Sequence, residues 1–295
     1  MNLKKHYICK VPFEYMEVHH MGVYSCCPAW LPTKISEIKE VSSVWVNEKL
    51  KEVHESILDG SYSLCEERLC PVLSELVNQG TVDRAFFITH DEFKKLDYTH
   101  PKIINYSFDR SCNLSCPSCR KDSIMANSDE IKEIDLVIKD IEDSFGKQMT
   151  GIYISGTADP FASKSFRKIL TKFDRSKYPN LTHVHLHTNA LLLDEKMWNE
   201  IGIDQFDLIL EDGLHETYAN KIFFSNSYHK LKPGGIYIIE DIINTEADNI
   251  RNFLKEYEMS DVLVFQLPVT NLWTDGTRFN GRVNNHDNSL AIVIK

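Results

Sequence analysis

Short apolar runs alternate with amphipathic patterns along the chain after residue 101. Five- and six-residue apolar runs of this kind are typical of buried strands, whereas apolar positions three and four residues apart indicate helices. The expected strands lie at 103–108, 151–155, 183–188, 206–210, 236–239, 262–266 and 289–294. The expected helices lie at 129–145, 166–173, 194–201, 216–230 and 246–257. Because strands and helices alternate, we expect parallel β/α units and an α/β fold.

The first 100 residues have a different character. They are rich in cysteine, and their helical patterns are confined to 47–58 and 71–77. We therefore divide the chain into three parts, residues 1–100, 101–201 and 202–295. Hydrophobic residues make up 42% of the sequence, which is enough to bury a core. A net charge of −10 argues against a nucleic-acid partner. Because no apolar run is long enough for a membrane span or a signal peptide, we expect a cytoplasmic protein.

Cysteine is distributed unevenly. All eight cysteines precede residue 120, and in a reducing cytoplasm they are poor candidates for a disulfide framework. Clustered thiols in such a chain indicate metal binding instead. The tightest group is Cys112-Asn-Leu-Ser-Cys116-Pro-Ser-Cys119, directly after the expected strand 103–108. Three thiolates can bind three irons of a [4Fe-4S] cluster and leave the fourth iron open to a ligand.

This CxxxCxxC motif at the end of a strand resembles the radical S-adenosylmethionine (SAM) superfamily. Gly156-Thr-Ala-Asp159 after the next strand is similar to the family's GGE motif, and Thr188-Asn189 is similar to its TNG motif. The resemblance implies that Gly156, Asp159 and Asn189 bind SAM, which the cluster cleaves to a 5′-deoxyadenosyl radical. It also implies an electron donor such as flavodoxin or ferredoxin, and a small-molecule or peptide substrate. The alternative is a structural zinc site, which needs a fourth ligand.

A second group of cysteines precedes the first. Cys9, the pair Cys26-Cys27, Cys65 and Cys70 resemble the SPASM or "twitch" module that accompanies many radical SAM enzymes. The resemblance implies an auxiliary [4Fe-4S] cluster held by Cys9, Cys65, Cys70 and one of the paired cysteines, of which we favour Cys27. A structural zinc site with four cysteine ligands is the alternative.

The C-terminal part resembles the second half of a metal-dependent sugar O-methyltransferase or cephalosporin-hydroxylase-like protein. Asp212-Gly-Leu-His215 follows one expected strand, and Glu240-Asp241 follows another after a Lys-Pro-Gly-Gly turn. The resemblance implies that Asp212, Glu240 and Asp241 bind a divalent metal such as Mg²⁺, with His215 as general base. From spacing alone, these residues are better explained as solvated strand ends and an ordinary loop histidine, and it is the combined pattern that points to a metal site.

Both resemblances are incomplete. The radical SAM pattern ends after about three β/α units, and the glycine-rich SAM loop that opens a methyltransferase is missing. We expect a partial radical SAM barrel with an N-terminal cysteine-rich module and a C-terminal Rossmann-like half-sheet. The favoured function is reductive SAM cleavage that modifies a peptide or sugar-containing substrate. The alternatives are a metal-dependent methyltransferase-like enzyme and a non-catalytic iron–sulfur or zinc protein.

Overall fold

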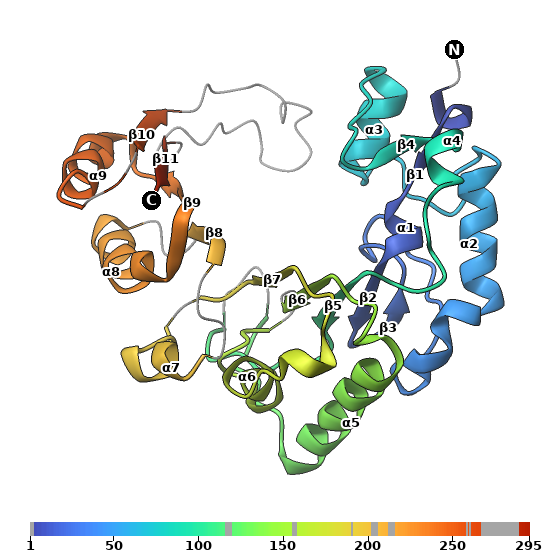
Figure 1. Ribbon diagram of the computed structural model, residues 1–295, viewed down its shortest axis with the longest axis horizontal. Coiled ribbons are helices and arrows are strands. Elements are labelled where there is room, and N and C mark those ends of the chain that lie inside the picture. Colours follow the sequence, from blue (N-terminus) through green and yellow to red (C-terminus); the bar gives the residue numbers. More distant parts are fainter. Residues whose placement is uncertain are drawn as a thin grey trace. The chain divides into compact units, whose positions relative to one another are not determined.

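The chain folds into two compact units, Met1–Thr188 and Asn189–Lys295, in a computed structural model. Figure 1 shows the elements of both units, and each unit is described here by itself. The structure describes residues 3–115, 120–154, 158–189, 191–201, 206–211, 216–257, 259, 261–266 and 289–295. Both units combine helices with sheets that contain parallel strands, so the expected α/β class is confirmed.

A five-stranded sheet organises unit 1, in the order β3-β2-β5-β6-β7. Strands β2, β5, β6 and β7 run parallel, and β3 pairs antiparallel with β2. The parallel arrangement predicted for residues 103–108, 151–155 and 183–188 is therefore confirmed. The strands are β2 Tyr15–His19, β3 Gly22–Tyr24, β5 Ile103–Ser107, β6 Gly151–Ile154 and β7 His183–Leu186.

Helices α5 (Ser128–Phe145) and α6 (Lys164–Thr171) supply the helical layer of the β/α units (Figure 1). Helix α5 begins at a capping box in which the Asn127 side chain accepts from the Glu130 N–H and the Glu130 carboxylate accepts from the Asn127 N–H. Tyr106 of β5 is fully buried and stacks on Phe166 of α6, with ring centroids 6.1 Å apart. The apolar face of the sheet is thus packed against α6.

The N-terminal residues contribute to the same sheet, which the sequence patterns did not predict. Strand β2 lies beside β5, with Glu17 opposite Asn105 and His19 opposite Ser107. Residues 15–19 alternate polar and apolar side chains, which is the strand signal. The remaining N-terminal elements are η1 Leu3–Lys5, β1 Tyr7–Cys9, α1 Val11–Glu14, η2 Ile38–Val46, α2 Glu48–Leu58, α3 Pro71–Asn78, β4 Phe87–Thr89 and α4 His90–Phe93, with β1 and β4 paired antiparallel; η3 Arg175–Lys177 follows α6.

Unit 2 holds a four-stranded sheet in the order β10-β11-β9-β8. Strand β8 runs parallel to β9 with Glu211 opposite Ile239, and β11 is antiparallel to both β9 and β10. The predicted parallel pairing of 206–210 with 236–239 is confirmed. The elements are α7 Glu195–Glu200, β8 Phe206–Glu211, α8 Thr217–Ser227, η4 Tyr228–Lys230, β9 Leu231–Ile242, η5 Asn244–Glu246, α9 Ala247–Leu254, β10 Asp261–Gln266 and β11 Ser289–Ile294.

The core of unit 2 lies between its sheet and helices α8 and α9. Phe224 of α8 meets Tyr237 of β9 edge-on, and Ile250 and Leu254 of α9 join the same buried cluster. The sequence analysis placed one domain boundary at residue 100. Strands from both sides of that boundary share the unit 1 sheet, so the three-part division stays a prediction. None of the described helices has the length and apolar character that a bilayer crossing requires.

Candidate functional site

The loops that follow β5, β6 and β7 meet at the carboxyl edge of the unit 1 sheet. Parallel strands bring their carboxyl ends to one edge, where open α/β sheets bind ligands. Asp159, in the loop after β6, joins all three loops. Its backbone N–H donates to Ser111 O (3.0 Å) after β5, and its Oδ2 accepts from Thr188 Oγ1 (2.7 Å) after β7.

The Asp159 carboxylate is almost completely buried, with 2% of the residue exposed. Its Oδ1 accepts hydrogen bonds from the backbone N–H groups of Phe161 (2.9 Å) and Ala162 (3.3 Å). The sequence resemblance assigned this carboxylate to the SAM amino group, and that role stays a prediction. The observed contacts give Asp159 a structural role, because they fix the loop after β6 against its two neighbours.

Cys112 is buried at the start of the loop that carries the cysteine triad. Its backbone N–H donates to Ile124 O (2.8 Å), and Ser123 Oγ donates to Cys112 O (2.9 Å), so the two ends of the loop are held together. Cys116, Cys119 and Gly156 lie outside the described residues. Asn189 is described, and its Oδ1 accepts from Leu191 N (3.1 Å) within unit 2.

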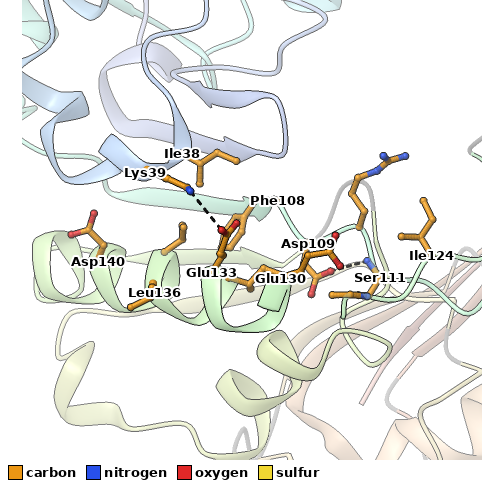
Figure 2. Close-up of a pocket in the computed structure, with 14 residues that line it drawn as sticks. Ile38, Lys39, Phe108, Asp109, Ser111, Ile124, Glu130, Glu133, Leu136 and Asp140 are labelled. Atoms are coloured by element: carbon orange, nitrogen blue, oxygen red, sulfur yellow. Dashed lines mark hydrogen bonds and ion pairs between the residues drawn. The ribbon is translucent and has the colours of Figure 1, made fainter. Parts of the chain in front are cut away.

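A cavity of about 660 Å³ adjoins the segment that leads to Cys112 (Figure 2). Asp109 and Ser111 line it next to the sheet, and Asp109 Oδ1 accepts from Ser111 N (2.8 Å). Lys39 of η2 and Glu133 of α5 form an ion pair beside it (3.6 Å). The cavity has the volume of small-molecule sites in proteins. The sequence analysis missed Asp109, although a carboxylate directly after a buried strand was the available signal.

The N-terminal thiols gather within unit 1. Burial raises the pKa of Cys9 and of Cys65 to about 12, and repulsion from Cys70 adds to both shifts. The pKa of Cys26 is also raised, first by burial and then by the nearby charges of Cys9, Cys70 and Cys65. Such repulsion acts between thiolates that lie near one another. Cys27 interacts in this way with Cys70, whose pKa burial also raises. The choice of Cys27 as ligand stays a prediction, and Cys26 interacts with three of the other thiols.

Hydrogen bonds tie the thiol-bearing segments together. Tyr62 has a positive φ of 52°, and its buried hydroxyl accepts from Cys9 N (3.0 Å) and donates to Tyr7 O (2.9 Å). Positive φ in a bulky residue is strained and persists only where the surroundings impose it. Glu66 N donates to Trp30 O (2.8 Å), which connects the Cys65–Cys70 segment to the loop after Cys27.

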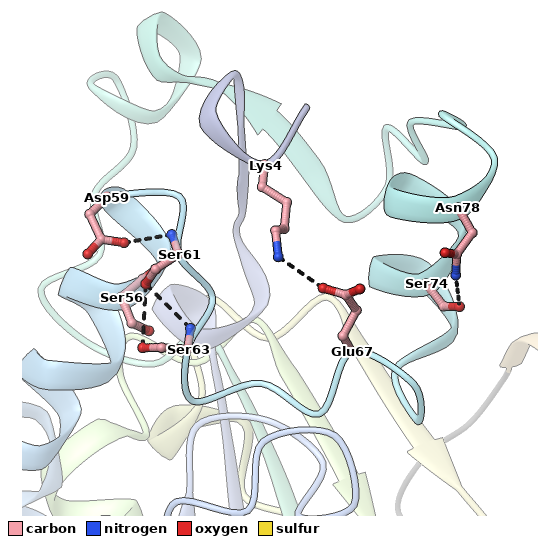
Figure 3. A network of polar contacts seen from close by, with 8 residues as sticks. All are labelled: Lys4, Ser56, Asp59, Ser61, Ser63, Glu67, Ser74 and Asn78. Carbon is pink, nitrogen blue, oxygen red and sulfur yellow. Dashed lines mark hydrogen bonds and ion pairs between the residues drawn. The ribbon is translucent and has the colours of Figure 1, made fainter. Parts of the chain in front are cut away.

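The first turn of α3 surrounds Cys70. Cys70 is the N-cap residue of α3 without a side-chain capping hydrogen bond, and the nearby backbone N–H groups of Leu73 and Val72 offset part of the rise that burial causes in the pKa of its thiol. Figure 3 shows the polar contacts around the same segment, including the ion pair of Lys4 with Glu67 (2.9 Å). Even so, no three histidine, cysteine, aspartate or glutamate side chains among the described residues are arranged to hold a metal ion.

The acidic positions of unit 2 are described only in part. Asp212 and His215 lie outside the described residues, as does the side chain of Asp241. Glu240 is described near the carboxyl end of β9, and Glu211 ends β8 with 6% of its surface exposed. The sequence analysis missed Glu211 because it lies one residue before the motif. Glu211 and Glu240 thus lie near the carboxyl ends of neighbouring parallel strands, one residue out of register, and the acidic site itself stays a prediction.

Comparisons with known proteins add little to this geometry. No protein-family model matches the chain, and no curated protein matches it. Among solved structures, an O-methyltransferase from Bacillus cereus in complex with SAH is 14% identical to this chain. The match covers 58% of this chain and 82% of the methyltransferase chain, with a TM-score of 0.29. A precorrin 8w decarboxylase from Methanobacterium thermoautotrophicum is 14% identical, covering 62% and 95%, with a TM-score of 0.26. Both TM-scores are too low to establish a shared fold.

Proposed function

We propose that unit 1 is an iron–sulfur protein of the radical SAM type. Cys112, Cys116 and Cys119 would hold a [4Fe-4S] cluster, and the surrounding loops would bind SAM for the modification of a peptide or sugar-containing substrate. One observation carries the proposal: the loops after β5, β6 and β7, which hold the three sequence motifs, meet at one sheet edge through Asp159. When bound, the cluster and SAM supply one-electron chemistry, which would need an electron donor such as flavodoxin or ferredoxin.

The protein's own contribution would be position and exclusion of water. Cys112 is buried, and the bridge between Cys112 and Ile124 closes its loop. The Asp159 contacts hold the loop after β6 against this segment. The neighbouring cavity offers room for a small molecule beside Ser111. These features suit a site that holds a reactive ligand away from solvent, because open water would compete for reactive intermediates.

Anaerobic reconstitution with iron and sulfide tests the proposal. We expect a broad absorbance band at about 400 nm and about four irons per chain from the triad. The variant Cys112→Ala/Cys116→Ala/Cys119→Ala should lose these irons, whereas the matched variant Ser115→Ala/Ser118→Ala in the same loop should keep them. SAM should then yield 5′-deoxyadenosine on reduction. A colourless protein, or equal iron in the triad variant, contradicts the proposal.

The N-terminal thiols would form a second metal centre of cysteine ligands. Cys9, Cys65 and Cys70 would be ligands with Cys27 as the fourth, and Cys26 is the alternative fourth ligand because Cys9, Cys70 and Cys65 add to the rise in its pKa. Because the described side chains are not arranged to hold a metal, no reaction step is assigned to this centre. The test is metal analysis of the triad variant, alone and with either Cys26→Ala or Cys27→Ala added. If the triad variant retains metal and only one of the two additions removes it, that cysteine is the fourth ligand.

A second candidate function belongs to unit 2. Asp212, Glu240 and Asp241 would hold a divalent metal with His215 as base, as in a metal-dependent methyltransferase, and the parallel pairing of β8 with β9, near whose carboxyl ends these residues occur, supports it. Formation of S-adenosylhomocysteine from SAM, rather than 5′-deoxyadenosine, would favour this function over the first.

A further inference from the structure

Strand β7 carries histidine at alternate positions. His183 and His185 lie within the strand, and His187 continues it, because its backbone N–H donates to Ile154 O of β6 (3.1 Å). Alternate residues of a strand project from the same face. All three histidines are exposed, whereas Val184 and Leu186 between them are half-buried. Three imidazoles therefore share one face of the strand that ends the described sheet.

Two of these imidazoles lie side by side. The ring centroids of His185 and His187 are 4.6 Å apart, with the ring planes at 83°. Tyr153, the register partner of His185 on β6, packs against the His185 ring at 4.8 Å. Within the described part of the chain, no hydrogen bond engages a ring nitrogen of His185 or His187. The two rings thus offer nitrogen atoms for metal coordination, and the strand and Tyr153 hold these rings in place.

His183 is oriented differently. Its Nδ1 lies 3.1 Å from Thr182 Oγ1, which donates its own proton to Thr150 O and so accepts from the imidazole. Its Nε2 lies over Gly151, close enough that a Cβ at residue 151 would come within 2.3 Å of it. His183 is therefore packed against β6, and the adjacent pair is the better chelating unit.

We propose that His185 and His187 bind one divalent first-row transition metal ion, such as Zn²⁺, Ni²⁺ or Cu²⁺, with water in its other positions. Imidazole nitrogen suits these ions, whereas Mg²⁺ and Ca²⁺ prefer oxygen. No third protein ligand converges among the described side chains, which leaves coordination positions for an external donor.

The test uses the full chain, because its cysteines also bind soft metals and must be present in every sample. Ni²⁺ binding is measured by calorimetry, and Cu²⁺ binding by electron paramagnetic resonance, in which imidazole ligands give nitrogen coupling. The variant His185→Ala/His187→Ala is compared with His90→Ala/His100→Ala, which removes two other histidines and leaves all eight cysteines. Thermal melts confirm that each variant is folded.

Wild type should bind one ion with nitrogen coupling, and the His185/His187 variant should lose that ion while the control variant keeps it. Loss of a hydrogen-bond partner of a metal ligand weakens metal binding about 10- to 100-fold. Replacement of His185 or His187 alone, which removes a ligand itself, should weaken Ni²⁺ binding at least as much. His183→Ala should retain the site. Equal Ni²⁺ affinity in wild type and the His185/His187 variant overturns the proposal, and so does loss of the ion in His183→Ala. Neither result depends on the cluster at Cys112, so this test is separate from that of the proposed function.

Discussion

Replacement of Asp159 by alanine should destabilise unit 1 strongly. The change removes acceptors for three donors, but Ala162 N–H keeps a second partner in Asp159 O (3.1 Å). Phe161 N–H, which is buried, loses its side-chain acceptor, and Thr188 Oγ1–H loses the Asp159 carboxylate. A stranded buried donor costs about 1–3 kcal/mol, so the loss at Phe161 N–H alone should lower the free energy of unfolding by about 1–3 kcal/mol.

The conservative variant separates structural from ligand-binding roles. Asp159→Asn keeps one carbonyl oxygen for Phe161 N–H, so we expect a smaller loss of about 1–2 kcal/mol from exchanging charged for neutral hydrogen bonds. Asp174→Asn is the matched control, because Asp174 Oδ1 also accepts from a backbone N–H two residues along, that of Ser176, but at the exposed surface. The control should leave stability almost unchanged.

Urea unfolding at neutral pH measures these changes, and amide hydrogen exchange at Phe161 and Ala162 reports the loop locally. If Asp159→Ala lowers stability by less than about 1 kcal/mol, the carboxylate does not join the loops and the reasoning fails. If Asp159→Asn unfolds like wild type yet no longer binds SAM, the role implied by the family resemblance holds instead.

Three further predictions follow from other parts of the chain. Burial, together with the nearby His20 and Arg110, lowers the pKa of His19 from 6.5 to about 4, so between these values the unfolded chain binds a proton that the folded chain does not. The free energy of unfolding should therefore decrease as the pH is lowered from 6.5 to 4. Urea titrations should show a weaker pH dependence for His19→Gln. Asn127→Ala removes the capping box of α5 and should lower the free energy of unfolding by about 1 kcal/mol, with Asn226→Ala in α8 as control. Glu240→Gln/Asp241→Asn should abolish Mg²⁺ or Mn²⁺ binding measured by calorimetry, and equal binding by wild type and variant would exclude the acidic site.

The elements after residue 101 could be predicted because their signals are local. The run 289–294 is a strand with the bounds expected, and the parallel orientation of β8 and β9 agrees with their connection through α8. Strand β9 is longer than the apolar run at 236–239 indicated, because pairing with β8 and β11 extends it to Leu231 and Ile242. Sheet pairing, rather than hydrophobicity alone, sets the length of that strand.

The site could be predicted less completely than the fold. Motif spacing identified Asp159 but not its partners, since the approach of Thr188 depends on β6 and β7 being neighbours in the sheet. Tyr62 could not be found from the sequence, because neither its positive φ nor its contact with Cys9 leaves a pattern in the neighbouring residues. Cys116 and Cys119 lie outside the described residues, so their grouping with Cys112 stays a prediction from spacing.

The position of β2 links the two cysteine groups physically. Strand β2 pairs with β5, which leads directly to Cys112, and β3 pairs with β2 and ends two residues before Cys26. A displacement of either strand would therefore act on both thiol groups through the shared ladder of hydrogen bonds. Because β2 is parallel to β5, its carboxyl end, His19, also lies at the sheet edge where Asp159 joins the other loops. The N-terminal residues thus belong to the framework of the candidate site, and a chain that begins after residue 100 would expose the β5 edge and its buried Ile104 and Tyr106.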